Sequence, residues 1–208
     1  MAGSIDFNSD LGEGAGTEMA LMPLITSANI ACGGHAGNEN TMRTTVELAM
    51  KNKVAIGAHP GYPDRERFGR VPMDITAREL IESIRRQVDS LVAIAERMGA
   101  RVTHVKAHGA LYNQGERDAT TARNIIFGVQ AARGGHELVI VAPPGSAMVE
   151  EASGMGMKVA RVRKLLGPPD ESARAGGQVC WDYGTPLSKG GMYAVCFRHG
   201  KVSYRSRG

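Results

Sequence analysis

The 208-residue sequence predicts an α/β fold made of parallel βαβ units. Short apolar runs, which are typical of strands buried on both faces, alternate with segments of helical periodicity. Four of these runs lead directly into loops rich in acids, histidines and glycines, at residues 5–14, 28–38, 54–64 and 102–113. Because such loops follow at least four strands, we expect a closed (β/α) barrel rather than an open sheet, whose site gathers at one switch point.

The segments between these runs predict helices. The clearest covers residues 76–98, where Thr76 and Glu79 form a capping box and Gly99 provides the stop. Its apolar side chains recur on one face, at Leu80, Ile84, Val88, Leu91 and Ala95. Two weaker helices are predicted over residues 38–51 and 119–132, and a buried strand over residues 138–142 precedes another helix that begins at Ser146.

Composition and charge argue against several classes of partner. Residues 1–157 have a net charge of −3 and residues 158–208 have a net charge of +7. The net positive charge of the chain is therefore confined to its last quarter, unlike that of a uniformly basic nucleic-acid-binding protein. No apolar run approaches the roughly 20 residues that span a bilayer, and no secretory signal is recognisable. The three cysteines have neither disulfide nor zinc-finger spacing. We therefore expect a cytoplasmic protein that binds neither nucleic acid nor membrane.

The chain divides into two regions of different character. Residues 1–161 contain the (β/α) units that bear the site. Residues 162–208 form an atypical basic tail without clear periodicity, which we expect to belong to the same domain or to be poorly ordered. Within it, only a short strand near residues 194–197 is predicted.

The first polar loop carries Asp10 and Glu13 among several glycines. The two acids fit a general base with its orienting partner, or equally a helix cap. The glycines match neither a dinucleotide-binding fingerprint nor a phosphate loop, so the sequence predicts no nucleotide site.

The second and third loops each carry one histidine, His35 and His59. Neutral imidazole suits proton transfer near pH 7 and metal coordination, so these histidines and Asp10 are candidate ligands for a divalent metal. A hydrogen-bonded structural histidine is the alternative. Asp64 in the third loop either orients His59 or pairs with one of the arginines that follow it, Arg65, Arg67 and Arg70.

The fourth segment places His104, Lys106 and His108 at alternate positions, which puts them on one face of a strand. Three long polar side chains on an otherwise apolar strand need partners to be buried. We expect this segment to point into the site, with Lys106 either as an amine whose pKa the histidines lower or as a fixed cation that stabilises negative charge.

These segments together resemble the LamB/YcsF family, through IDFNSDLGEG, SANIACGGHAG, NKVAIGAHPGYPDRERFGR and HVKAHGALYN. The resemblance covers residues 5 to about 161 and implies a barrel of the glycoside hydrolase/deacetylase type. It also implies one component of a 5-oxoprolinase, which opens 5-oxo-L-proline to L-glutamate with ATP and partner subunits B and C. Without a phosphate loop here, the partner subunits are expected to bind ATP as co-substrate.

The resemblance implies roles for the polar residues of the loops. Asp10 or His59 is the expected general base, and Lys106 with His108 stabilises developing negative charge. The expected substrate-binding residues are Asn8, Glu13, His35, Asp64 and Arg70.

The sequence departs from the family pattern in three places. Asn38 replaces an acid, Ala107 replaces a proline, and the segments that the family has after Arg161 are missing. We therefore expect a barrel that is incomplete at its C-terminal end. Two other functions remain open: a metal-dependent, deacetylase-like hydrolase and a non-catalytic binding subunit.

Overall fold

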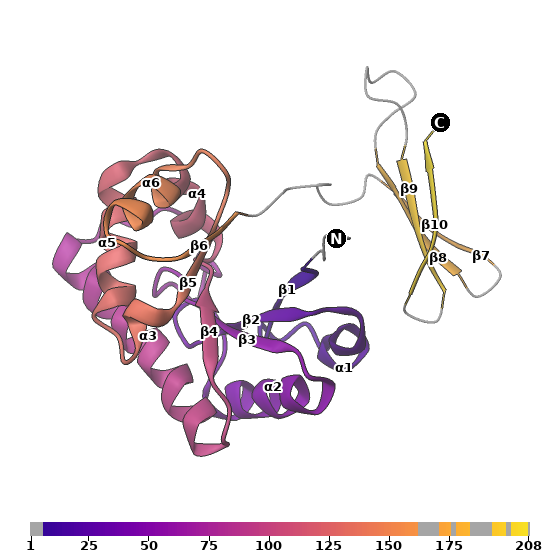
Figure 1. Cartoon of the computed structure of the whole chain (residues 1–208), viewed down its shortest axis with the longest axis horizontal. Helices are drawn as coiled ribbons and strands as arrows, with labels where there is room; N and C mark the ends of the chain where they lie inside the picture. Colours follow the sequence, from indigo (N-terminus) through magenta and orange to yellow (C-terminus); the bar gives the residue numbers. More distant parts are fainter. Residues whose placement is uncertain (1–5, 162–170, 176–177, 184–192, 199–200, 208) are drawn as a thin grey trace. The chain divides into compact units, whose positions relative to one another are not determined.

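A computed structural model describes residues 6–161, 171–175, 178–183, 193–198 and 201–207 (Figure 1). The chain divides into two compact units, Met1–Val162 and Arg163–Gly208, which are considered separately below.

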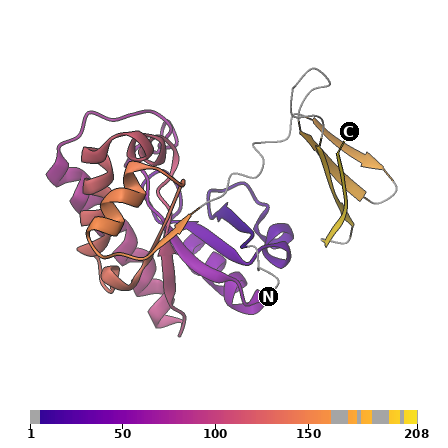
Figure 2. The same cartoon turned by 45° about the horizontal axis from the view of Figure 1, so that its top comes forward.

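The first unit is built on a sheet of six parallel strands (Figures 1 and 2). The strands are β1 (Asn8–Leu11), β2 (Ser27–Ala31), β3 (Ala55–His59), β4 (Val102–Val105), β5 (Val139–Ala142) and β6 (Val159–Arg161). They neighbour one another in sequence order, without the reversal that defines a switch point. In the described part of the chain β1 and β6 do not pair with each other. The predicted fold, an incomplete (β/α) barrel, is therefore confirmed.

Helices connect successive strands and cover one face of the sheet (Figures 1 and 2). They are α1 (Glu18–Leu21), α2 (Glu39–Asn52), α3 (Ala77–Arg97), α4 (Gly109–Arg117), α5 (Ala119–Gln130) and α6 (Ala147–Gly154), with 3-10 turns η1 (Met22–Leu24) and η2 (Gly135–Glu137). The helices predicted from periodicity are all present as α2, α3, α5 and α6. Helix α4 was not predicted, because its nine residues follow a polar loop and contain two glycines.

Helix α3 shows how local sequence fixes the element. Thr76 Oγ1 accepts a hydrogen bond from the Glu79 N–H at 3.3 Å, and Glu79 Oε2 accepts one from the Thr76 N–H at 3.1 Å. These two bonds satisfy N–H groups that have no partner within the helix. The predicted apolar stripe is buried against the sheet and against α5. Capping thus sets where α3 begins, and its apolar face sets how it packs.

The two faces of the sheet differ in chemistry. Ala28, Ile30 and Ile56 point to the helix side and join the hydrophobic core. Residues at the alternating positions, such as Asn8, Asp10 and Asn29, contact one another on the opposite face. A parallel sheet with one polar face has room for a site there, at the C-terminal ends of its strands.

The second unit contains an antiparallel sheet in the order β10-β9-β8-β7. Its strands are β7 (Glu171–Ala175), β8 (Gln178–Tyr183), β9 (Tyr193–Arg198) and β10 (Lys201–Arg207). The short strand expected near residues 194–197 lies within β9. The other three were not predicted, because they are short and the glycine- and proline-containing stretches between them leave no clean period in this region of the sequence. In the described part of the chain no helix is long and apolar enough to cross a membrane.

We predict that Thr76→Ala lowers the free energy of unfolding by about 1 kcal/mol, because it removes the hydroxyl that accepts from the Glu79 N–H and donates to Glu79 Oε2. Urea unfolding followed by circular dichroism at 222 nm measures it. Thr76→Ser keeps the hydroxyl and is expected to recover most of the loss. Equal stability of the alanine variant and the unsubstituted chain would show that the cap contributes nothing.

Candidate active site

Six of the predicted site residues meet at the C-terminal edge of strands β1 to β4. Asp10 lies in β1 and Glu13 follows it; His35 follows β2, and His59 ends β3. Lys106 and His108 follow β4, with His108 as the residue that caps α4. Because the strands are parallel and neighbour one another in sequence order, loops separated by up to 96 residues converge here.

The Glu13 carboxylate lies at the centre of three histidines. Its Oε1 atom is 3.0 Å from His35 Nε2, 3.2 Å from His108 Nδ1 and 3.5 Å from His59 Nε2. The three imidazole rings are almost completely buried. We call these four residues the histidine–glutamate cluster.

Ionisation within this cluster follows from its contacts. Burial alone would raise the pKa of Glu13, but its contacts with His108, His35 and His59 lower it to about 2. Burial, together with the neighbouring His108 and His59, lowers the pKa of His35 to about 4 despite its bond to Glu13. Near neutral pH, Glu13 is therefore ionised and His35 is neutral.

Backbone carbonyls fix the other two imidazoles. His59 Nδ1 lies 2.7 Å from the Lys106 carbonyl oxygen, and His108 Nε2 lies 2.9 Å from that of Phe68. A carbonyl oxygen can only accept, so both of these ring nitrogens carry hydrogen. Their second nitrogens, His59 Nε2 and His108 Nδ1, face each other at 3.0 Å and both face Glu13.

Next to the cluster, Lys106 forms an ion pair with Asp10. Lys106 Nζ donates to both carboxylate oxygens at 2.9 Å. Asp10 Oδ2 also lies 3.4 Å from His59 Nε2. Burial opposes ionisation of Asp10, but the contacts with His59 and Lys106 outweigh it and hold its pKa well below the ordinary range. The site therefore presents a partly exposed cation and anion beside the buried histidines.

A hydrogen-bonded row of polar side chains, centred on Asn29, holds Asp10 in this ion pair. Asn29 is fully buried in β2, and its amide donates to Asp10 Oδ1 at 2.6 Å. The Asn29 carbonyl oxygen accepts from Asn8 at 3.2 Å and from His104 Nε2 at 3.0 Å. At Gly57 a Cβ atom would stand 2.1 Å from His104 Nε2, so only glycine leaves room for that ring. Asn8 and His104 thus act on Asp10 through their hydrogen bonds to Asn29.

The loop after β3 closes over the cluster. Gln87 of α3 accepts from the Gly61 N–H at 3.0 Å and donates to the Gly61 carbonyl at 2.8 Å. Phe68 has a left-handed backbone (φ 55°), which is uncommon for a residue other than glycine, and its ring packs edge-on against His35 and His108. This conformation directs the Phe68 carbonyl at His108. The loop therefore sets the orientation of the catalytic candidates.

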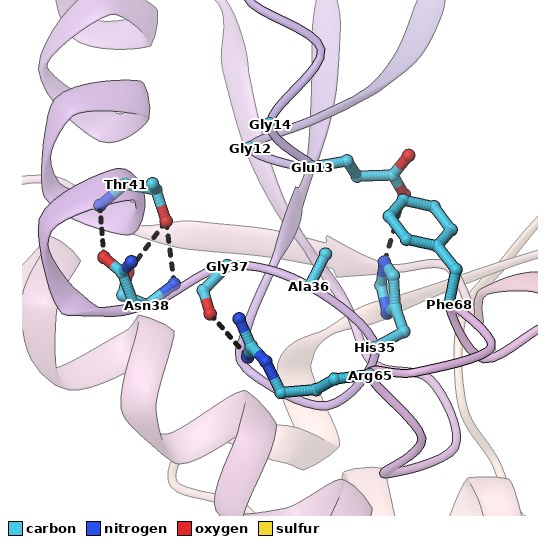
Figure 3. A pocket seen from close by; sticks show the side chains of 10 residues that line it. All are labelled: Gly12, Glu13, Gly14, His35, Ala36, Gly37, Asn38, Thr41, Arg65 and Phe68. Carbon is cyan, nitrogen blue, oxygen red and sulfur yellow. Dashed lines mark hydrogen bonds and ion pairs between the residues drawn. The ribbon is translucent and has the colours of Figure 1, made fainter.

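A pocket of about 300 Å³ opens beside Glu13 and His35 (Figure 3). That volume is at the small end for ligand sites. Arg65 borders the pocket and donates from Nη1 to the carbonyl oxygens of Gly33 at 3.2 Å and Gly37 at 2.8 Å. Phe68 borders it on the other side (Figure 3). A small polar ligand bound here would contact the carboxylate of Glu13.

The donor set of the cluster fits a transition metal. Three imidazoles and one carboxylate offer ligand atoms that all lie within 4.8 Å of one another. Such nitrogen-rich sets suit zinc, cobalt or iron, whereas magnesium and calcium prefer oxygen. The ligand candidates predicted from sequence were Asp10, His35 and His59. The structure instead groups the two histidines with Glu13 and His108, while Asp10 pairs with Lys106.

The region that holds the site is also the region that matches known proteins. Residues 5–163 match the LamB/YcsF family. The chain belongs to the LamB/YcsF family. The matched region coincides with the first compact unit, so the family segment includes every residue of the site described above.

Two similar proteins are informative. The A subunit of 5-oxoprolinase from Methylococcus capsulatus is 43% identical over 166 residues, which is 77% of this chain and 63% of that protein. The crystal structure of the lactam utilization protein from Thermus thermophilus is similar with a TM-score of 0.73 and 38% identity, over 76% of this chain and 66% of that one. The chain therefore spans slightly less than two thirds of the length of either relative.

Three further predicted residues lie outside the central group. Asn8 contacts Ser27 and Asn29 in the supporting row. Asp64 pairs with Arg67 at 2.8 Å, and His59 is held by the Lys106 carbonyl, so the suggestion that Asp64 orients His59 is wrong. Arg70 lies over the ring of Phe68, with 5.2 Å between its guanidinium carbon and the ring centroid.

Sequence reasoning missed three residues that shape the site, Asn29, Phe68 and Gln87, and it named Arg65 without placing it at the site. Two had a recognisable signal. Asn29 is a lone amide within the apolar run of β2, and Gln87 interrupts the apolar stripe of α3. Buried polar side chains at such positions need specific partners. The roles of Arg65 and Phe68 depend on loop conformation and have no local signal.

We predict a strong energetic coupling between Asp10 and Lys106. In a double-mutant cycle of Asp10→Asn and Lys106→Met, the coupling free energy of unfolding is expected to be about 1–2 kcal/mol. The exposed Glu39–Arg97 pair, at 3.3 Å, provides the matched control and is expected to give about 0.5 kcal/mol or less. Similar values for the two pairs would mean that burial does not strengthen the Asp10–Lys106 contact.

Proposed function

We propose that this chain is the lactam-binding subunit of an ATP-dependent 5-oxoprolinase, which opens 5-oxo-L-proline to L-glutamate. Its two relatives, the A subunit of a 5-oxoprolinase and a lactam utilization protein, support this proposal. The structural observation that carries it is the Asp10–Lys106 ion pair beside His59, because this arrangement combines a fixed cation with proton acceptors next to the histidine–glutamate cluster.

The chemistry explains the need for partner subunits. A lactam is resonance-stabilised, so water adds to its carbonyl slowly. Transfer of a phosphoryl group from ATP to the lactam oxygen turns that oxygen into a leaving group. Water then adds to the activated carbon, the ring C–N bond breaks as the departing nitrogen takes a proton, and a second water hydrolyses the resulting γ-glutamyl phosphate to L-glutamate and phosphate. Since this sequence has no phosphate-loop motif, we assign ATP binding to partner subunits B and C.

Within this scheme each charged residue has a distinct task. Lys106 stabilises negative charge that develops on the lactam oxygen, with His108 nearby. Asp10 and His59, whose facing atoms are 3.4 Å apart, form the proton-accepting pair for the attacking water. His59 is the better base of the two, because the lowered pKa of Asp10 makes that carboxylate a weak acceptor. Asp10 then mainly positions Lys106.

Substrate recognition is assigned to the residues around the pocket. Glu13 and His35 border it and contact the ring amide, while Arg65 pairs with the substrate carboxylate. Asn8 acts through Asn29, which holds Asp10. Asp64 acts by accepting a hydrogen bond from the Arg67 backbone N–H in the same loop at 3.2 Å, and Arg70 by covering Phe68.

We predict that Lys106→Met lowers ATP-dependent formation of L-glutamate at least about 100-fold in the complex reconstituted with its partner subunits, because the fixed cation is lost. Chromatographic quantification of L-glutamate measures the rate. Glu39→Gln, on the exposed surface of α2, is the control and is expected to keep full activity. Asp10→Asn is expected to follow Lys106→Met; unchanged activity of both variants would exclude the assigned roles.

A second function, metal-dependent hydrolysis of an acetylated substrate, is favoured by the donor set of the histidine–glutamate cluster. The same assay separates the two functions. Release of acetate from an acetylated sugar without ATP would establish the second function. Tight binding of 5-oxoproline without turnover, in the presence of the partner subunits, would identify a non-catalytic binding subunit.

Arg65 gives a test of substrate orientation. We predict that Arg65→Met raises KM for 5-oxoproline at least about 10-fold with a smaller change in kcat, because the carboxylate is distant from the reacting bond. Arg67→Met alters an arginine in the same loop that pairs with Asp64 rather than bordering the pocket. It is expected to change KM less than about 2-fold. Equal effects of the two substitutions would mean that only the net charge of the loop matters.

A further inference from the structure

The facing nitrogens of His59 and His108 are an unusual pair. Each ring has one nitrogen that donates to a backbone carbonyl, His59 Nδ1 to Lys106 and His108 Nε2 to Phe68. In the neutral forms of the rings, both remaining nitrogens are lone-pair acceptors. They are 3.0 Å apart, and Oε1 of Glu13 faces both. With neutral rings, three acceptor atoms meet without a hydrogen among them, although buried polar atoms are normally paired.

We infer that His59 Nε2, His108 Nδ1 and the Glu13 carboxylate form a binding site for one divalent transition-metal cation. The spacing of the three atoms supports this. Neighbouring ligand atoms on tetrahedral zinc are about 3.3 Å apart, given bonds of about 2.0–2.1 Å. The three distances here are 3.0, 3.2 and 3.5 Å. The His59 and His108 rings are nearly perpendicular, at 89°.

His35 has a different role from the other two histidines. Its ring is stacked on that of His108, with centroids 3.6 Å apart and an angle of 2°. A cation in the plane of His108 lies far outside the plane of His35, whereas an imidazole binds metal in its own plane. His35 therefore donates from Nε2 to Glu13 at 3.0 Å and orients the carboxylate. Its Nδ1 is a buried acceptor with no hydrogen-bond partner among the described residues.

The backbone carbonyls provide what a metal-binding histidine requires. A bond from the second ring nitrogen to a carbonyl oxygen fixes both the tautomer and the ring orientation. Three protein ligands leave further positions open, as in catalytic rather than structural zinc sites. The local charge is also suitable, since Glu13 and Asp10 carry two negative charges against one positive charge on Lys106.

This inference does not depend on the reaction proposed above, because it concerns only the arrangement of donors. It does change one assignment. With a cation on His59 Nε2, that nitrogen no longer accepts a proton, and Asp10 is the remaining acceptor beside the site.

Binding of Co²⁺ and Zn²⁺ to the purified chain tests the inference. After treatment with a chelator, the chain is expected to bind one Co²⁺, with visible absorption bands of a four- or five-coordinate ion. Zn²⁺ is expected to displace it in isothermal titration calorimetry. His59→Gln, His108→Gln and Glu13→Gln are each expected to weaken Co²⁺ binding at least about 100-fold, and His35→Gln about 10-fold.

His104→Gln is the matched control, because His104 is also buried on the polar face but bonds to Asn29 outside the cluster. It is expected to leave Co²⁺ affinity within about 3-fold. Circular dichroism of each variant establishes that it is folded. Failure of the folded, unsubstituted chain to bind Co²⁺ or Zn²⁺, or equal affinity in the His59 and His104 variants, would overturn the inference and leave a shared proton as the explanation of the 3.0 Å contact.

Metal binding and the proposed function can fail separately. Stoichiometric Co²⁺ binding without ATP-dependent glutamate formation would support the metal site and reject the 5-oxoprolinase assignment. Glutamate formation by a chain that binds no Co²⁺ would reject the metal site and support the 5-oxoprolinase assignment.

Discussion

The organisation of the site depends on one constraint: a half-buried carboxylate must be matched by polar partners. Glu13 is ionised at neutral pH, and its partners are three histidines from three different loops. Their convergence requires β1, β2, β3 and β4 to pair in the observed register. A shift of one residue in any strand would turn its polar side chains to the helix side. The fold and the site are therefore specified together.

The second determinant is the backbone of the loop around Phe68. Its left-handed conformation points a carbonyl at His108, while the ring packs on two histidines. Gly69 and Gly109 allow this loop to lie against α4, since a Cβ on Gly109 would stand 2.6 Å from the Gly69 carbonyl oxygen. Backbone strain of this kind persists where the surroundings fix it, and it is concentrated at functional sites. Here it fixes the direction of one imidazole.

The sequence predicted what depends on local chemistry. Helix α3 follows from its capping box and apolar stripe, and the strands follow from their apolar runs. The convergence of the polar loops follows from parallel topology alone. Individual contacts were less accessible: Asp10 was expected among metal ligands, but its partner is Lys106, 96 residues away. The contact between Asp10 and Lys106 depends on how their side chains meet across the polar face of the sheet, and no local sequence pattern encodes it. The strands β7, β8 and β10 were missed for a different reason: they are short, and the glycine- and proline-containing stretches between them leave no clean period in this region.

The two functions considered for this site share more chemistry than their names suggest. Both hydrolyse an amide bond, and both need a cation near the carbonyl oxygen and an acceptor near the water. Occupancy of the histidine–glutamate cluster by a metal therefore does not by itself separate them. The difference lies in the electrophile: an acetamide polarised by a metal can react directly, whereas a phosphorylated lactam is already activated and needs charge stabilisation and a proton acceptor but no metal. Lys106 is suited to that charge stabilisation, because Asp10 holds its charge next to the cluster whether or not the cluster holds a metal. Dependence of catalysis on Lys106 without dependence on a bound metal would thus indicate an activated lactam as the substrate.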